Sequence, residues 1–150
     1  MVTVKAQMNS LDKLAAAWKL QNLKLLPAES RERVIAVFDG LGVQPSEQLI
    51  RLYTTIGGFE IADENDWTLW SLDRVEEESR DERSTDGILF SDYLVSCWCF
   101  RLKLAAHGEM EVLRDAFDSN HPCHVVAKDL ETFFTAMIED PDSALGNRRS

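Results

Sequence analysis

Cysteine and histidine are the residues in this sequence whose types and spacing suggest chemistry. Cys97 and Cys99 flank a tryptophan, and Cys123 lies in the string HPCH at residues 121–124. A structural zinc ion binds four Cys or His ligands, and these strings contain enough donors for one ion. Their spacing differs from the Cys-x-x-Cys and His-x-x-x-His steps that wrap a metal. We therefore expect no metal, and a zinc or thiol site on Cys97, Cys99 and Cys123 is the minor alternative.

Other catalytic arrangements are also disfavoured. A reactive thiolate needs a partly exposed, electropositive setting, and the tryptophan-containing strand around Cys97 and Cys99 is a poor one. The sequence has neither a Gly-x-Ser-x-Gly elbow nor a phosphate-binding Gly-x-x-x-x-Gly-Lys loop. Carboxylates that act as acid and base need environments that separate their pKa values, whereas a run such as 76–78 is typical of a solvated surface. We expect a protein that is not an enzyme and has no cofactor.

Composition indicates one globular domain. The chain has 150 residues, of which 45% are hydrophobic and 28% charged. It has no run of 18 apolar residues, and charges interrupt its first apolar segment, so we expect neither a membrane span nor a signal peptide. Three cysteines are an odd number and too few for a disulfide scaffold. Reduced thiols and a cytoplasmic location are therefore expected.

Most of the net charge of −10 comes from one segment. Residues 59–92 contain twelve acidic residues against three arginines, a net of −9, whereas residues 1–27 contain four lysines and one aspartate. A nucleic-acid-binding protein would instead concentrate Lys and Arg, because phosphate neutralisation supplies much of its affinity. We therefore expect a basic protein partner and no nucleic acid. Solvation alone is the alternative explanation for such an acidic surface.

Two tryptophans lie inside the acidic segment, and aromatic side chains beside charge are typical of a protein-binding hot spot. We expect Trp70 in the core and Trp67 exposed as an apolar contact. The predicted partner-binding residues are Glu60, Asp63, Glu64, Asp66, Trp67, Glu76, Glu77 and Glu78.

Hydrophobic periodicity predicts four helices. The first covers residues 11–25 and carries Leu11, Leu14 and Trp18 on one face. That face is either core or a self-association surface, which leaves a homodimer open. The other helices lie within residues 28–42, 45–56 and 128–140. Ser30, Ser46 and Asp129 lie near their starts, and glycines or a proline lie near their ends.

Alternating apolar residues predict strands at 67–72, 93–104, 110–113 and 123–127. In the longest of them both faces are apolar in the middle, as in a central strand that is covered on both sides. Cys97 and Cys99 would then line a buried wall. Residues 72–87 have little apolar content and predict one short helical turn followed by an exposed loop.

Four strings resemble a known family. They are VIAVFDGLGVQPSEQLIRLYTTIGGFE, LWSLDRVEEE, ILFSDYLVSCWCFRL and KDLETFFTAMI, at residues 34–60, 69–78, 88–102 and 128–138. Together they resemble the SUKH superfamily, which includes the fungal Smi and Knr cell-wall regulators and many bacterial immunity proteins. Ile56 stands where that family has an asparagine before its glycine pair, and Gln44 where it has a leucine before proline.

The resemblance implies an α+β fold, a single domain with a central, largely antiparallel sheet and helices packed around it. The N-terminal 25 residues lie outside the resemblance. We expect an N-terminal helical extension at 1–27 packed on or beside a SUKH-like domain at 28–140, and a frayed tail at 141–150. The resemblance also implies a non-catalytic binding protein. We expect an immunity protein that neutralises a basic, nuclease-like toxin domain by binding it; an intracellular regulatory scaffold of the same fold is the alternative.

Overall fold

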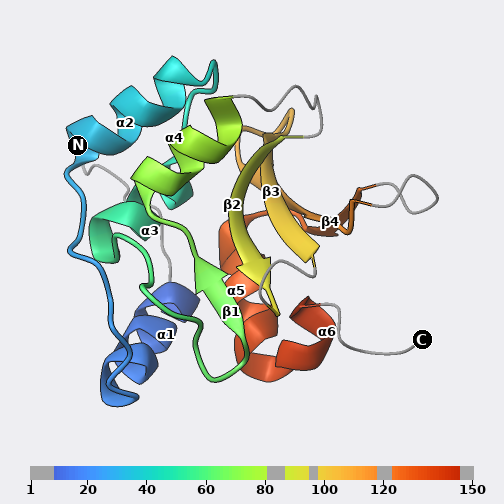
Figure 1. Ribbon diagram of the computed structural model, residues 1–150. Coiled ribbons are helices and arrows are strands. Elements are labelled where there is room, and N and C mark those ends of the chain that lie inside the picture. Colours follow the sequence, from blue (N-terminus) through green and yellow to red (C-terminus); the bar gives the residue numbers. More distant parts are fainter. Residues whose placement is uncertain (1–8, 81–86, 95–97, 118–122, 146–150) are drawn as a thin grey trace, which may run out of the picture.

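The computed structural model describes residues 9–80, 87–94, 98–117 and 123–145. In this part of the chain, helices surround an antiparallel sheet of five strands in the order β1-β2-β3-β4-β5 (Figure 1). The helices are α1 (Asn9–Leu20), α2 (Arg31–Gly40), α3 (Glu47–Thr55), α4 (Leu72–Arg80), α5 (Leu130–Glu139) and α6 (Pro141–Leu145). The strands are β1 (Trp67–Leu69), β2 (Ile88–Tyr93), β3 (Trp98–Leu104), β4 (Met110–Asp115) and β5 (His124–Ala127). The predicted α+β fold is confirmed, and none of the described helices is long and apolar enough to cross a membrane.

Three helices begin directly after a residue whose side chain caps the helix N-terminus. The Ser30 hydroxyl accepts a hydrogen bond from the third residue of α2, and Ser46 and Asp129 do the same for α3 and α5. Each cap satisfies one of the backbone N–H groups that a helix leaves without an internal partner.

The first helix, α1, is shorter than predicted and belongs to the common core. It ends at Leu20, and the backbone at Asn22 then takes a left-handed conformation (φ 55°), which asparagine tolerates. Leu11 and Trp18 are buried in the same cluster as the residues of the sheet. For Leu11 and Trp18 the core interpretation is therefore correct, whereas Leu14 on the same predicted face is only partly buried.

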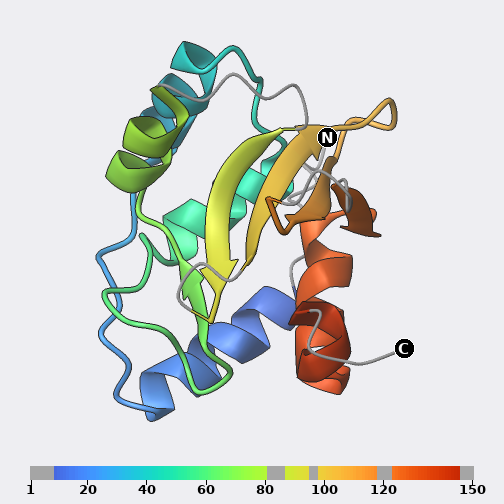
Figure 2. The ribbon, with the colours of Figure 1, turned by 45° about the vertical axis from the view of Figure 1, so that its right-hand side comes forward.

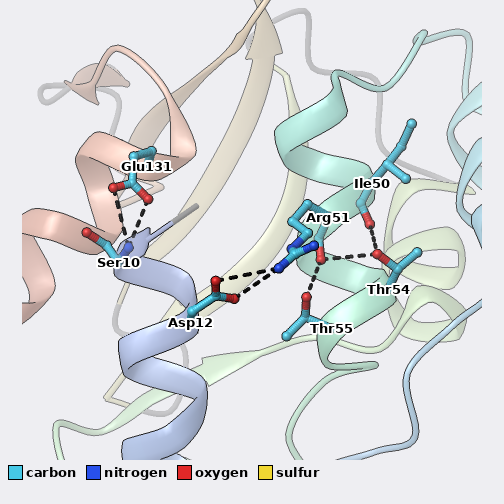
Figure 3. Close-up of polar contacts among 7 residues, drawn as sticks. All are labelled: Ser10, Asp12, Ile50, Arg51, Thr54, Thr55 and Glu131. Atoms are coloured by element: carbon cyan, nitrogen blue, oxygen red, sulfur yellow. Dashed lines mark hydrogen bonds and ion pairs between the residues drawn. The ribbon is translucent and has the colours of Figure 1, made fainter. Parts of the chain in front are cut away.

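Polar contacts dock the start of α1 onto α5 and α3 (Figure 3). The Ser10 backbone N–H donates to Glu131 Oε1 at 3.1 Å, which places a carboxylate at the helix N-terminus. Arg51 on α3 reaches Asp12 in the same first turn of α1 at 3.3 Å. These contacts fix the direction in which α1 runs across the molecule.

The single long strand predicted at 93–104 is wrong, because these residues contain the last residue of β2 and the separate strand β3. β2 ends at Tyr93, the backbone at Leu94 is left-handed (φ 51°), and β3 returns antiparallel with Trp98 opposite Tyr93. Apolar residues alternate as regularly through two successive strands as through one, so periodicity alone did not show where β2 ends and β3 begins. The central position of β3 is confirmed, because Cys99 to Leu102 are all buried.

One face of the sheet packs on α5. Phe100 on β3 lies 5.3 Å from Phe133 between ring centroids. Just after the end of β1, the Trp70 carbonyl accepts a hydrogen bond from the Tyr53 hydroxyl on α3 at 2.8 Å. The Phe100–Phe133 contact thus attaches the sheet to α5, and the Tyr53–Trp70 hydrogen bond attaches the chain after β1 to α3.

Two segments are more ordered than the sequence predicted. Residues 72–80 form the nine-residue helix α4 instead of a single turn, with Arg74 lying over the Trp70 ring at 4.1 Å and 3.5 Å from Asp92. Residues 141–145 of the expected frayed tail form α6, whose Leu145 carbonyl accepts from Trp98 Nε1 at 2.6 Å. Both corrections have one cause: tertiary contacts supply the stability that local periodicity lacks.

Candidate functional site

The loop at residues 60–66, here called the acidic loop, connects α3 to β1 and lies beside α1. The chain enters it through a close antiparallel contact, in which the Glu60 N–H donates to the Lys24 carbonyl at 3.0 Å and Gly57 N–H to that of Leu26 at 3.1 Å. A Cβ at Gly57 would lie 2.0 Å from the Pro27 carbonyl oxygen. Only glycine allows the two segments to come this close, so Gly57 determines where the acidic loop begins.

Asp63 holds the acidic loop in one conformation. Its Oδ1 accepts hydrogen bonds from the backbone N–H groups of Asn65 at 2.8 Å and Trp67 at 3.1 Å. Its Oδ2 accepts from Trp18 Nε1 at 3.1 Å, which ties the loop to α1. The residue is only 6% exposed, and this burial raises the pKa of its carboxyl while the three hydrogen bonds oppose the rise.

Asp63 was predicted to contact a partner directly, and the structure corrects this assignment. Its carboxylate faces inward, where one oxygen accepts from two backbone N–H groups and the other from Trp18 on α1. A short run of polar residues favours such a local turn, because an Asp side chain accepts readily from backbone N–H groups one or two residues further on. The role left to Asp63 is to position its neighbours.

The prediction that Trp67 is exposed is wrong. Its side chain is 0% exposed and stacks on Trp18, with ring centroids 5.9 Å apart, and it packs edge-on to Phe59 at 5.4 Å. Trp70 is buried as well, as predicted. Within β1, the buried Trp67 and Leu69 alternate with the half-buried Thr68, and α1 and α5 cover the Trp67 side. Trp70 follows the end of the strand and is buried separately, so the burial of Trp70 did not imply that Trp67 faces solvent.

The acidic loop nevertheless presents three carboxylates to solvent. Glu60, Glu64 and Asp66 are exposed, and Ile61 between them is 60% exposed. Sequence reasoning missed Ile61, although a large apolar residue inside the string EIADEND was a visible signal. The loop therefore offers charge and one apolar side chain on a held backbone.

The remaining predicted residues lie elsewhere. Glu76, Glu77 and Glu78 are on α4, which packs against α2 and β2. Figure 1 and Figure 2 both show α4 beside α2 at one end of the molecule and the acidic loop beside α1 at the other. The acidic segment that is continuous in sequence thus forms two separate surfaces.

The cysteine-rich strings contribute no reactive centre among the described residues. Cys99 is buried, and burial together with the negative charge of Asp92 raises the pKa of its thiol to about 12, so the thiolate is scarce at neutral pH. Cys123 lies beside Asp115 and donates to its carboxylate. In the described part of the chain, no three His, Cys, Asp or Glu side chains are placed to hold a metal ion. Cys97 and His121 lie outside the described residues.

The face of β3 opposite Phe100 carries a buried ion pair. Arg101 is buried, and its Nε donates to Asp115 Oδ2 at 2.7 Å while a terminal nitrogen donates to the Gly87 carbonyl at 3.0 Å. The backbone N–H of Phe117 donates to the other Asp115 oxygen at 2.8 Å. With most of its donors and acceptors satisfied in this way, the pair is structural.

The acidic loop is accordingly the best candidate for a functional surface. Comparison of the chain with protein-family models and with curated proteins found no match.

Proposed function

We propose that the protein is a non-catalytic, SUKH-like binding module that acts as an immunity protein and neutralises a basic, nuclease-like toxin domain. One observation carries the proposal: the acidic loop presents three exposed carboxylates on a backbone that Asp63 holds from within. A loop that is ordered before binding loses little conformational entropy when the partner arrives.

The mechanism is steric and electrostatic. Glu60, Glu64 and Asp66 steer a partner surface rich in Arg and Lys and pair with it, which raises the association rate most at low salt. Ile61 takes the role of apolar contact that the buried Trp67 cannot fill. Occupation of the toxin's basic surface then blocks access of its nucleic-acid substrate.

The experiment begins with tagged protein in native cell extract at low and high salt, followed by mass spectrometry and a toxicity test of each bound protein. We expect one basic, salt-sensitive partner that kills cells unless this protein is co-expressed. Several harmless partners would favour the regulatory scaffold instead.

Two matched triple variants then locate the interface. E60Q/E64Q/D66N removes three charges from the acidic loop, and asparagine suits position 66 because its backbone is left-handed (φ 63°). E76Q/E77Q/E78Q removes the same number from α4. We expect the loop variant to slow association about tenfold or more and to flatten its salt dependence, and the α4 variant to bind almost as the wild type does. Equal behaviour of the two variants contradicts the assignment to the loop.

A further inference from the structure

A groove of about 280 Å³ lies between α1, the acidic loop and the end of α5. Apolar side chains from two helices line it, namely Leu14 and Ala17 from α1 and Met137 and Ile138 from α5. Two exposed side chains of opposite charge, Lys13 and Glu64, also border it.

An exposed leucine stands next to this groove. Leu20 is 86% exposed, the highest value for a large apolar side chain among the described residues. It lies three residues after Ala17, and residues three apart are neighbours on a helix surface. Ala16 on the same outer side of α1 is small and exposed, so a second helix can approach closely. Groove, alanines and leucine form one apolar surface that nothing in the described chain covers.

We propose that a second copy of this chain occupies the groove. The two α1 helices pack antiparallel about a two-fold axis near Ala17, and Leu20 of each copy inserts into the groove of the other. A two-fold interface must be complementary to itself, so a surface of one charge would repel its copy.

The charges around the groove satisfy that requirement. Lys13 lies one turn before Ala17 on α1. Glu64 lies at the other end of the helix, because its neighbour Asp63 is bonded to Trp18 and because Glu64 borders the groove together with Gln21. Antiparallel packing about Ala17 therefore sets Lys13 of each copy against Glu64 of the other.

Sedimentation velocity of the full chain from about 1 to 200 µM tests the inference, and we expect a monomer–dimer equilibrium. L20E removes the apolar contact and should weaken association by at least about tenfold. L104E is the matched control, because Leu104 is also exposed but lies far from the groove. The start of β3 is next to the acidic loop, since Leu94 at the end of β2 donates to the Asp66 carbonyl, whereas Leu104 is at the opposite end of β3. Circular dichroism should show both variants folded, because both positions are on the surface.

A charge exchange tests the orientation. K13E and E64K should each weaken the dimer, and K13E/E64K should restore it. A wild type that stays monomeric up to 200 µM, a dimer that L20E leaves intact, or a double variant that fails to recover would overturn the inference. Glu64 also belongs to the surface proposed to bind the toxin, so only part of this test is separate from the proposed function. L20E and L104E leave all three loop carboxylates in place, so their effect on the dimer is measured separately from toxin binding.

Discussion

Replacement of Asp63 by alanine tests whether one buried carboxylate organises the acidic loop. The change removes the acceptor of three N–H groups, of which those of Trp18 and Trp67 are buried. A buried donor without a partner costs about 1–3 kcal/mol, and relief of the buried charge returns part of the total. We expect the free energy of unfolding to fall by about 2–4 kcal/mol.

The assay is urea unfolding followed by tryptophan fluorescence, because Trp18 and Trp67 stack on each other next to Asp63. D63N keeps a carbonyl oxygen for the two backbone donors but points an amide at the Trp18 N–H, so we expect a loss of about 1–2 kcal/mol. E64A, an exposed neighbour in the same loop, should change stability by no more than about 0.5 kcal/mol. If D63A also stays within that limit, the acidic loop is not held by Asp63.

The pH dependence gives a second test of the same residue. Burial raises the folded-state pKa of Asp63, so its contribution to stability is full below the ordinary pKa and is lost as the pH rises through the raised value. D63N does not titrate at this position. The stability advantage of the wild type over D63N should therefore shrink as the pH rises from about 4 toward neutrality. A constant or growing difference over that range contradicts a raised pKa.

Two further predictions concern the framework. G57A should destabilise the protein severely or prevent folding, because its Cβ would lie 2.0 Å from the Pro27 carbonyl oxygen; G40A, where nothing lies within 4 Å, should fold normally, and thermal melts of the two compare them directly. R101M should lower the free energy of unfolding by about 3–5 kcal/mol by leaving Asp115 without its cation, and R101M/D115L should recover most of the loss in a double-mutant cycle. A cycle in which the two changes simply add would show that the buried pair is not coupled.

Local signals in the sequence determined much of the framework. Ser30, Ser46 and Asp129 marked the starts of three helices, because a capping side chain acts within three residues of its own position. The apolar faces of α3 and α5 and the burial of β3 followed from periodicity in the same way. The concentration of acids in residues 59–92 also identified the segment that contains the candidate site.

Only the tertiary structure decided which of those acids belong together and which face solvent. Exposure depends on what packs against a residue from elsewhere in the chain: α1 and α5 cover Trp67, so the exposed apolar side chain of the acidic loop is Ile61. Asp63 became an internal anchor because Trp18, 45 residues earlier, donates to it. Glu76 to Glu78 lie at the other end of the molecule because β1 separates the acidic loop from α4. Such long-range contacts leave no periodic trace in a sequence, since periodicity records the burial of a face and not the identity of what buries it.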